Sequence, residues 1–311
     1  MMTVTDFYFP SSDGENRIRA RRWQDDEREP VGLLQISHGI IEHIERYDDF
    51  ARYMAAKGFI VFGNDHLGHG KSVKADYDLG FFGAEDGWEH VVDDVHQLHD
   101  VMNGEYPQLP YFILGHSMGS FILRTYLIRY PEDRLTGALI SGTGQQPKIV
   151  LLGGVILAKL ECWRLGSRGI SRIANNLSLN SYNKFFEPSR TPHDWLSRDE
   201  EQVDRNLADP LCNFDPSVSA LLEMLRGIRF IGSVKNARRM RHDLPVFFFS
   251  GDKDPVGEQG KGVRRAVDVF KKAGMVDVKL KLYPEGRHEM LNELNRGEVY
   301  GDVSAWIEEK M

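Results

Sequence analysis

The sequence predicts an α/β fold built on a mostly parallel eight-stranded sheet, flanked by helices and interrupted by a helical lid. Short apolar runs alternate with segments of helical periodicity through most of the 311 residues, which is the pattern of a parallel sheet covered by helices. One apolar run, residues 111–114, passes through a Gly-x-Ser-x-Gly sequence straight into a helical segment. The strand pattern disappears between residues 144 and 236 and then resumes. The length suits one large domain that carries an insertion.

The first two strands are expected to form an antiparallel hairpin at one edge of the sheet. Residues 3–9 and 16–23 alternate enough to predict strands, and the segment 11–14, Ser-Ser-Asp-Gly, favours a turn between them. The later strands are short apolar runs, which indicates that they are buried. They are expected at residues 31–37, 59–63, 111–114, 137–142, 244–250 and 276–282.

Helices are expected between these strands. Residues 46–57 place Phe50 and Met54 at helical spacing, and Gly58 is expected to end that helix. Residues 88–103 form a longer amphipathic pattern with an apolar side. Further helices are expected at residues 121–127, 259–273 and 296–310.

The lid is predicted from a change in composition. Residues 144–236 are helical or irregular and rich in Arg, Asn and Ser, whereas the segments on either side carry the strand pattern. A helical insertion after the sixth strand of an α/β sheet is how a lid is attached. We therefore expect a core of residues 1–143 and 237–311, and a lid of residues 144–236.

Composition and charge exclude several classes of protein. The 41% hydrophobic and 27% charged content is typical of a globular protein, and the net charge of −7 argues against a nucleic-acid partner. Two cysteines, Cys162 and Cys212, are too few for a disulfide framework and indicate a reducing compartment. The N-terminus lacks the pattern of a signal peptide, and no apolar run approaches the roughly 20 residues that span a bilayer. A cytoplasmic protein is expected.

The Gly-x-Ser-x-Gly sequence predicts a nucleophile, Ser117. A strand, this sequence and a helix in that order form a nucleophile elbow, in which the serine occupies a strained turn above the sheet. Gly115 and Gly119 are needed because only glycine lets the strand and the helix approach so closely. An ordinary turn is the alternative, so the chain must also supply an acid, a base and an oxyanion hole.

Chain order selects the acid and the base, because in this arrangement both follow the serine, the acid first. Asp252 and Asp254 follow the seventh expected strand. Asp254 is favoured because Pro255 after it suits a fixed turn, although Asp252 lies closer to the strand end. The expected base is His288, which follows the last strand. Asp254 should accept from one imidazole nitrogen while the other nitrogen faces the serine.

An oxyanion hole needs two N–H donors about 3 Å from the developing charge. The backbone of Met118, at the start of the helix after the serine, is expected to supply one. The backbone of Ile40, after His38-Gly39, is expected to supply the other. A tight turn at His38-Gly39 without that role is the alternative.

Other patterns in the sequence give little support for a phosphate, dinucleotide or metal site. The glycines at 63 and 68 lack the Gly-Lys-Ser register of a phosphate loop, and no Gly-x-Gly-x-x-Gly follows the first strand. Asp65, His66 and His69 are possible metal ligands, but the neighbouring glycines favour a structural turn. We therefore expect neither a metal ion nor a cofactor.

Three motifs occur in a recognisable order. They are His38-Gly39-Ile40-Ile41-Glu42-His43 with Arg46-Tyr47, then Asp65-His66-Leu67-Gly68-His69-Gly70-Lys71-Ser72, and Gly115-His116-Ser117-Met118-Gly119. Together they resemble the monoacylglycerol lipase and lysophospholipase group of the α/β-hydrolases, which shades into esterases and serine aminopeptidases. The resemblance covers nearly the whole chain outside the lid and implies an α/β-hydrolase fold.

The resemblance also implies roles for particular residues. Ser117 would be the nucleophile, Asp254 the acid and His288 the base, and the oxyanion donors would be those named above. Mammalian members tend to have small residues after the His-Gly pair, whereas Ile40 and Ile41 are bulky. This departure leaves the backbone donor intact but affects the width of the acyl slot that Ile41 is expected to border.

The activity that the resemblance implies is that of a serine carboxylester hydrolase. It would cleave a small lipid ester, similar to a monoacylglycerol or a lysophospholipid, through an acyl-enzyme and without a cofactor. An aminopeptidase or amidase of the same fold is one alternative, and it would need a lid carboxylate such as Glu161, Glu187 or Asp194 to hold the substrate amine. A non-catalytic binding protein is another, although such proteins have normally lost a member of the triad.

The choice of substrate is expected to depend on the lid. Its most apolar stretch, residues 149–158, is expected either to form the wall of the acyl-chain site, with Leu151 and Val155 as binding residues, or simply to pack as a lid helix. Its length of about ten residues favours burial over spanning a membrane. On the first interpretation, transient contact with lipid aggregates or a membrane surface is expected. The sequence does not indicate an oligomeric state.

Overall fold

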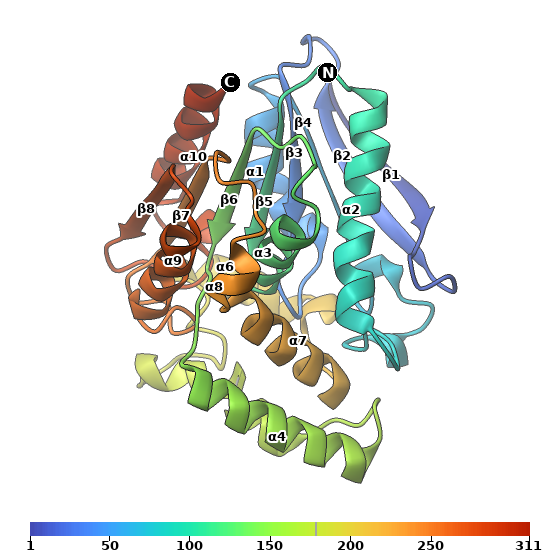
Figure 1. Cartoon of the computed structure of the whole chain (residues 1–311), viewed down its shortest axis with the longest axis vertical. Coiled ribbons are helices and arrows are strands. Elements are labelled where there is room, and N and C mark those ends of the chain that lie inside the picture. The colour runs from blue at the N-terminus through green and yellow to red at the C-terminus, as the bar shows by residue number, and fades with distance from the viewer. Residues whose placement is uncertain (178) are drawn as a thin grey trace.

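The computed structural model describes residues 1–177 and 179–311 and contains an eight-stranded sheet (Figure 1). The strand order is β1-β2-β4-β3-β5-β6-β7-β8. β2 pairs antiparallel with both β1 and β4, and the remaining pairs are parallel. The strands are β1 (Met2–Pro10), β2 (Arg17–Asp25), β3 (Gly32–Ser37), β4 (Phe59–Asn64), β5 (Tyr111–His116), β6 (Gly137–Ser141), β7 (Val246–Gly251) and β8 (Val278–Tyr283).

The expected strands are confirmed, and their ends lie within two residues of the expected positions. The β1–β2 hairpin forms one edge of the sheet. β3 to β7 are buried along their whole lengths, because helices cover both faces of the sheet. Strands in this position need no alternation of polar and apolar residues, which explains their continuous apolar runs.

Helices cover the two faces of the sheet (Figure 1). α1 and α10 contribute to the core on one face, and α2, α3 and α9 to the core on the other. These five confirm the helices expected outside the lid. Their bounds are α1 (Asp48–Ala55), α2 (Gly87–Glu105), α3 (Met118–Arg129), α9 (Lys261–Ala273) and α10 (Arg296–Lys310), with short 3-10 turns at η1 (Ile44–Tyr47), η2 (Gly70–Ser72), η3 (Asp76–Asp78) and η6 (Met290–Asn292).

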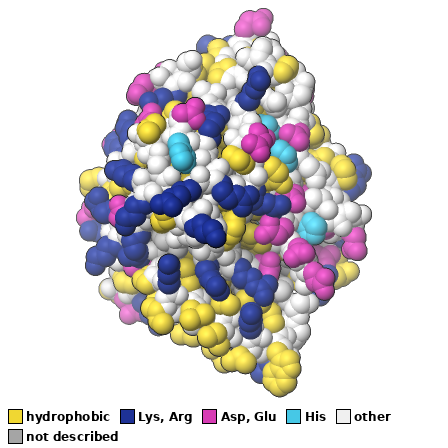
Figure 2. Space-filling model, in the orientation of Figure 1, with side chains coloured by type: hydrophobic (Ala, Val, Ile, Leu, Met, Phe, Trp, Pro, Cys, Tyr) yellow, Lys and Arg dark blue, Asp and Glu magenta, His cyan; other side chains and the backbone are white. Residues whose placement is uncertain are grey.

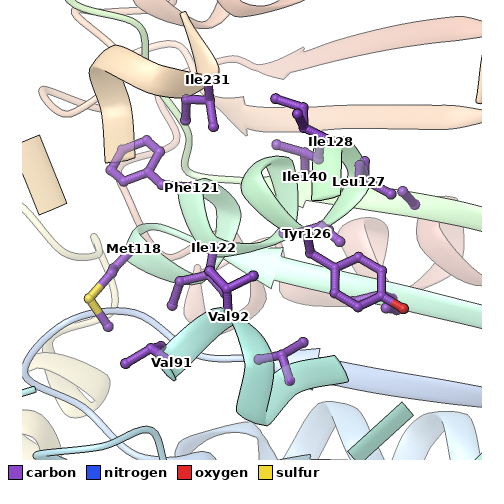
Figure 3. Close-up of a cluster of buried hydrophobic side chains, with 14 of the residues drawn as sticks. Val91, Val92, Met118, Phe121, Ile122, Tyr126, Leu127, Ile128, Ile140 and Ile231 are labelled. Atoms are coloured by element: carbon purple, nitrogen blue, oxygen red, sulfur yellow. The ribbon is translucent and has the colours of Figure 1, made fainter. Parts of the chain in front are cut away.

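Helix α3 lies within the larger hydrophobic core (Figure 3). Its side chains, among them Phe121 and Ile122, share this core with Val91 of α2, Ile140 of β6 and Ile231 of α7. Every residue from 118 to 128 is buried. Because each buried side chain of this size contributes about 1.5–3 kcal/mol, the position of the first turn of α3 is strongly defined.

The segment between β6 and β7, predicted as the lid, contains helices and, in its described residues, no strand. α7 packs on α4 and also against α3, where Leu221, Met224 and Ile228 join the main core. The division between core and lid therefore stays a prediction. The elements are α4 (Lys148–Leu165), α5 (Arg172–Leu177), η4 (Leu179–Phe186), α6 (Glu200–Ala208), η5 (Pro210–Cys212), α7 (Val218–Ile231) and α8 (Val234–Ala237).

Helix α4 lies at the end of the molecule opposite the chain termini (Figure 1). Leu151 and Val155 are on its buried side, which packs against α7. The opposite side is apolar as well but is open to solvent. Its exposed residues are Ile149, Val150, Leu152, Ile156, Leu160, Trp163 and Leu165. Even so, no helix in the described parts of the chain is long and apolar enough to cross a membrane.

Candidate active site

Ser117 forms a strained turn between β5 and α3. Its backbone has φ +52° and ψ −119°, a conformation that costs energy in any residue with a side chain. Its N–H donates to the Ser141 carbonyl oxygen (3.0 Å), which ties the turn to β6. A Cβ at Gly119 would collide with the Ser37 and His38 carbonyl oxygens, and one at Gly115 with the Gly119 carbonyl. Both glycines are therefore required by the close approach of strand and helix.

The expected acid and base are in contact. Nδ1 of His288 lies 3.0 Å from Oδ1 of Asp254, and both side chains are buried. Asp254 also accepts from the Val256 N–H (2.9 Å) and from the Ser250 hydroxyl (3.1 Å), so its orientation is fixed. Asp252 instead accepts from the Glu285 N–H (2.8 Å), and its side chain is partly exposed. The geometry thus favours Asp254 over Asp252 as the partner of His288.

The surroundings of His288 raise its basicity. Burial alone would lower the pKa of this imidazole, but Asp254, and beyond it Glu289 and Glu42, outweigh burial and raise it. The ring of His116 lies 4.7 Å away between centroids. Burial, together with the nearby His288, lowers the pKa of His116 to about 4, so His116 is neutral at physiological pH. His288 is therefore the more basic histidine of the two.

The two residues expected to supply the oxyanion donors border the same space. Ile40 and Met118 line a common cavity with Ser117. Within the described chain, neither N–H donates a hydrogen bond to another protein group. Gly39 lies directly beside the serine, because a Cβ built there would come within 3.1 Å of the Ser117 Cβ. The backbone N–H groups of two residues at this cavity therefore have no protein acceptor in the described chain.

His38 fixes the direction of the Ile40 amide. Its Nε2 accepts from the His66 N–H (3.0 Å), so Nδ1 carries the proton and donates to the Gly39 carbonyl oxygen (2.7 Å). That carbonyl and the Ile40 N–H belong to one trans peptide and point in opposite directions. The bond from His38 therefore turns the Ile40 N–H away from His38. Burial lowers the pKa of His38 to about 4, which keeps one nitrogen a donor and the other an acceptor.

A buried charge network joins the oxyanion loop (residues 38–43) to the histidine loop (residues 284–293). Arg46 donates to both carboxylate oxygens of Glu289 (2.5 and 2.7 Å) and to Glu42 (3.0 Å). Glu42 accepts in turn from the Gly39 N–H and from the Tyr47 hydroxyl. The sequence motif contains Glu42 and Arg46, but Glu289 is 243 residues from Arg46 in the chain, and sequence reasoning missed it.

A cavity of about 560 Å³ lies over Ser117. Its core side brings together the expected nucleophile, base and both oxyanion donors, together with Ile41. Its lid side includes the aromatic residues Tyr182, Trp195 and Phe214. The volume falls within the roughly 300–1,000 Å³ of sites that bind small organic molecules. Ile41 has φ +58°, which is strained for a β-branched residue and places a second distorted backbone beside Ser117.

Leu151 and Val155 do not border this cavity. They lie on the buried side of α4, where they hold the helix to the rest of the protein. The structure therefore does not bring these two residues to the acyl chain, and the packing interpretation of α4 describes them better. The physical reason is that a helix that is apolar all round must use one stripe for its own packing.

The lid carboxylates expected for an aminopeptidase are only partly at the cavity. Glu187 lines it, whereas Glu161 is paired with Arg164 (2.6 Å) and bonded to the Ser171 hydroxyl. Asp194 accepts from the hydroxyl and the N–H of Thr191 and is not among the residues that line the cavity. Of these three acids, Glu187 is therefore the one that could bind a ligand in the cavity.

Asp65 is not arranged as a metal ligand with His66 and His69. Its carboxylate accepts from Arg19 (3.1 Å) and from the backbone N–H groups of Ile44 and Lys71 (2.9 Å each). This bonding is that of a structural turn.

Two other clusters in the described residues hold three possible ligand atoms within 4.8 Å of one another. They are His43 with Asp209 and Cys212, and His96 with His99 and Asp133. A His–Asp hydrogen bond of 2.8 or 3.0 Å already joins two members of each cluster and accounts for their proximity.

Comparisons with known proteins match most of the chain, including the segment between β6 and β7. A family model described as serine aminopeptidase, S33, matches residues 28–295. The chain is 29% identical to the monoacylglycerol lipase of Mycolicibacterium smegmatis over 301 residues, 94% of each chain. It is 40% identical to the monoglyceride lipase homolog of monkeypox virus, over 89% of this chain and 90% of the viral protein.

One solved structure is similar to this one over nearly the whole of both chains. A thermostable carboxyl esterase from Bacillus coagulans, solved in complex with glycerol, superposes with a TM-score of 0.91. The two sequences are 29% identical, and the match covers 99% of each chain. The sheet, the flanking helices and the segment between β6 and β7 are thus all included in the likeness.

Proposed function

The chain belongs to the S33 serine aminopeptidase family, and we propose that it is a serine carboxylester hydrolase that cleaves monoacylglycerol-like lipid esters. Its fold is the α/β-hydrolase fold and it is a hydrolase, as its motifs predicted. The M. smegmatis and viral relatives are named as lipases of monoglycerides, and the Bacillus protein as a carboxyl esterase. These names support esters, rather than peptides, as the substrates of this chain.

One observation carries the proposal. A single cavity contains Ser117, the His288 that Asp254 orients, and two backbone N–H groups without protein acceptors in the described chain. These are the parts that acyl transfer requires, namely a nucleophile, an oriented base and preorganised donors for an oxyanion.

In the proposed first step, Oγ of Ser117 attacks the ester carbonyl carbon while Nε2 of His288 takes the hydroxyl proton. The carbonyl oxygen becomes an oxyanion and accepts from the N–H groups of Ile40 and Met118. Asp254 stabilises the imidazolium through Nδ1. When the tetrahedral intermediate collapses, the bond to the alcohol breaks and His288 returns the proton to the departing oxygen.

In the second step, water attacks the acyl-enzyme. His288 takes a proton from the water, the same two N–H groups hold the second oxyanion, and the fatty acid leaves as Oγ of Ser117 recovers its proton. Every group named in these two steps belongs to the chain, to the ester or to the attacking water.

The lid side of the cavity favours an uncharged polar head group. Asn206 and Asn213 line it with uncharged amide groups, and Lys184 is accompanied there by the carboxylates of Glu187 and Asp215. A glycerol head group can bond to such side chains without the cationic pocket that a phosphate requires. We therefore infer that a monoacylglycerol is preferred over a lysophospholipid.

A hydrolysis panel tests the substrate class. Monoacylglycerols of graded acyl length, a lysophosphatidylcholine of matched chain, a short p-nitrophenyl ester and an aminoacyl amide would be compared by kcat/KM. Fastest turnover of a monoacylglycerol supports the proposal. Preference for the lysophospholipid corrects the head group, and preference for the amide supports the aminopeptidase alternative, in which Glu187 would hold the amine.

Replacing Ser117 with Ala tests the catalytic assignment itself. We expect Ser117→Ala to lower ester turnover by about five to six orders of magnitude, because the nucleophile is lost and only the oxyanion hole and binding remain. The wild-type chain should react with a fluorophosphonate probe, and the variant should not. A labelled and active Ser117→Ala protein would refute the assignment, and an unlabelled, inactive wild type would favour a non-catalytic binding protein.

The exposed side of α4 is proposed to meet the surface of a lipid aggregate. Figure 2 shows hydrophobic side chains gathered at the α4 end of the molecule, with Lys and Arg side chains beside them. Ile149 and Trp163, 76% and 87% exposed, are among the most open apolar residues of the described chain. A helix with exposed apolar side chains beside basic ones is suited to lie in the interface of a membrane. Because α4 packs on α7, whose Met224 lines the cavity, a substrate in the aggregate would approach the cavity from this end of the molecule.

A further inference from the structure

The lid supplies a side chain that lies against the imidazole of His288. The rings of Trp195 and His288 are 5.0 Å apart between centroids, and their planes are inclined by 37°, closer to stacked than to edge-on. The ring of His116 also lies near this imidazole, at 4.7 Å between centroids. Both Trp195 and His288 line the cavity, so the contact is made beside the site of reaction.

Hydrogen bonds hold Trp195 in this position from both sides. The Trp195 carbonyl oxygen accepts from the His288 N–H (3.4 Å), and the Leu196 carbonyl oxygen from the Glu289 N–H (2.8 Å). The Trp195 N–H donates to the side chain of Asn183 (3.1 Å). The lid segment 194–197 and the histidine loop therefore form one unit.

The guanidinium of Arg287 strengthens this unit. It donates to the Asp194 carbonyl oxygen and to the Ser197 carbonyl oxygen (3.1 Å), which lie on either side of Trp195 in the chain. Tyr182 packs on the indole at 5.0 Å between ring centroids and makes no ring contact with His288. The indole is therefore held in place by lid residues, and it contacts the imidazole of His288.

We propose that Trp195 is a positioning residue for the base, and that its indole supports the imidazolium that His288 forms when it takes the Ser117 proton. This inference rests on the proposed function of the site. The negative face of an aromatic ring attracts a cation within about 6 Å of its centroid, and most strongly where water is excluded. The indole can therefore stabilise the protonated base more than the neutral one, which lowers the barrier to proton transfer.

Other charged and titratable groups also face His288, and they come from four parts of the chain. They are Asp254 after β7, Glu289 in the histidine loop, Glu42 and Arg46 in and after the oxyanion loop, and His116 at the end of β5. A change at Trp195 leaves each of these in place. An effect of that change on the titration of His288 can therefore be attributed to the indole.

The pH dependence of kcat/KM on a short soluble ester tests the proposal, because its acidic limb reports the loss of a proton from His288. Trp195→Leu removes the ring and keeps an apolar side chain. We expect kcat/KM to fall about three- to tenfold and the acidic limb to move to lower pH. Trp195→Phe, which restores a ring face, should recover most of both effects.

Tyr182→Leu is the matched control. It removes an aromatic wall of the same cavity without a ring contact to His288, so KM is free to change while the acidic limb keeps its midpoint. An unmoved limb in Trp195→Leu, or a limb that moves to higher pH, would overturn the proposal. The second result would mean that the indole acts only as a shield against water. A limb that moves equally in Tyr182→Leu would overturn it as well.

Tryptophan fluorescence supplies a second readout, which tests whether the indole contacts the imidazole as it titrates. If the indole contacts the titrating imidazole, the emission of the intact enzyme should change with pH at the midpoint of the kinetic limb. The change should be absent in Trp195→Phe and in His288→Asn. Fluorophosphonate labelling of Ser117 should persist in Trp195→Leu at a lower rate. A failure of the Trp195 proposal is thus distinguishable from a failure of the serine hydrolase assignment, which would abolish labelling in the wild type.

Discussion

Asp252 and Asp254 follow the same strand, yet their carboxylates have different environments. Asp254 is buried and bonded to His288, whereas Asp252 bonds to the Glu285 N–H near the surface. We expect Asp254→Asn to lower kcat for ester hydrolysis by roughly four orders of magnitude, because an amide can present N–H to Nδ1 and favour the wrong tautomer. Asp252→Asn should change kcat by less than about twofold. Steady-state kinetics on folded variants, checked by circular dichroism, decide the matter, and the reverse result would reassign the acid.

The position of Glu289 leads to a prediction about the pH dependence of kcat/KM that the triad alone would not give. Asp254, Glu289 and Glu42 outweigh burial and raise the pKa of His288, and the base must be unprotonated to act. Glu289→Gln removes one of these negative charges, so the pKa of His288 falls and the acidic limb of kcat/KM moves to lower pH. Because Arg46 keeps Glu42 as a partner, the unfolding free energy should fall by no more than about 3–5 kcal/mol.

Glu285→Gln is the control for this prediction. Glu285 belongs to the same loop, but its side chain is exposed and pairs with Lys253 (3.2 Å). Removing the charge of Glu285 should leave the acidic limb of kcat/KM at the same pH. An unshifted limb in Glu289→Gln would show that this carboxylate acts on Arg46 alone.

At the residue scale, the sequence was sufficient to predict a site residue where its neighbours in the chain indicate its backbone conformation. The glycines around Ser117 and the proline after Asp254 indicate their turns directly. Glu289 and Trp195 were missed because their importance depends on what they meet, Arg46 in one case and His288 in the other. Nothing in the residues next to them in the chain indicates those contacts.

At the element scale, α4 shows why a pattern can predict a helix without orienting it. The strands and core helices were predictable because burial on known faces gives them apolar runs or amphipathic periods. α4 is apolar on nearly every side, so its sequence does not say which stripe packs on α7. Leu151 and Val155 were expected either at the substrate or in the packing of the helix, and the structure shows them in the packing stripe.

The exposed stripe of α4 leads to a test with two kinds of substrate. We expect the double variant Ile156→Ser, Trp163→Ser to lower the hydrolysis of a monoacylglycerol in vesicles by at least about tenfold, because two exposed apolar anchors are removed. Turnover of a soluble short ester should stay within about twofold of wild type. Co-sedimentation with the vesicles measures the loss of binding.

Val276→Ser is the matched control, since Val276 is 79% exposed but precedes β8, outside the lid. Vesicle activity should be retained in this variant. Equal losses on vesicles and on the soluble ester in the α4 variant would mean that these side chains support the fold or the cavity instead of docking.

At the scale of the whole molecule, the candidate site is assembled from parts that are distant in sequence. The serine lies after β5, the acid after β7, the histidine after β8, and the oxyanion loop after β3. All four follow the carboxyl ends of parallel strands, so the sheet brings them to one edge. The sequence could predict this arrangement because the topology is regular. It could not predict how the lid is attached over the site, since that depends on individual polar contacts.

Glu293 joins the lid to the histidine loop through several hydrogen bonds, and this leads to a prediction about the molecule as a whole. Its carboxylate is fully buried and accepts from the Arg198 guanidinium (2.9 Å) and N–H (3.2 Å) of the lid, and from the Arg287 N–H (2.9 Å) of the histidine loop. Removing the charge should release the lid and the histidine loop together. We expect Glu293→Gln to cost near the lower end of about 3–5 kcal/mol of unfolding free energy, because Arg198 is 27% exposed.

The loss should be visible as a lower Tm, faster proteolytic cleavage within residues 144–236, and a lower kcat on a soluble ester. Glu308→Gln, which removes a half-exposed partner of Lys57 (2.8 Å), should leave all three unchanged, because surface pairs contribute little. If Glu293→Gln lowered Tm without changing lid cleavage or kcat, Glu293 would stabilise only the core. Coupled changes in all three would mean that the lid and the catalytic histidine are held by the same contacts.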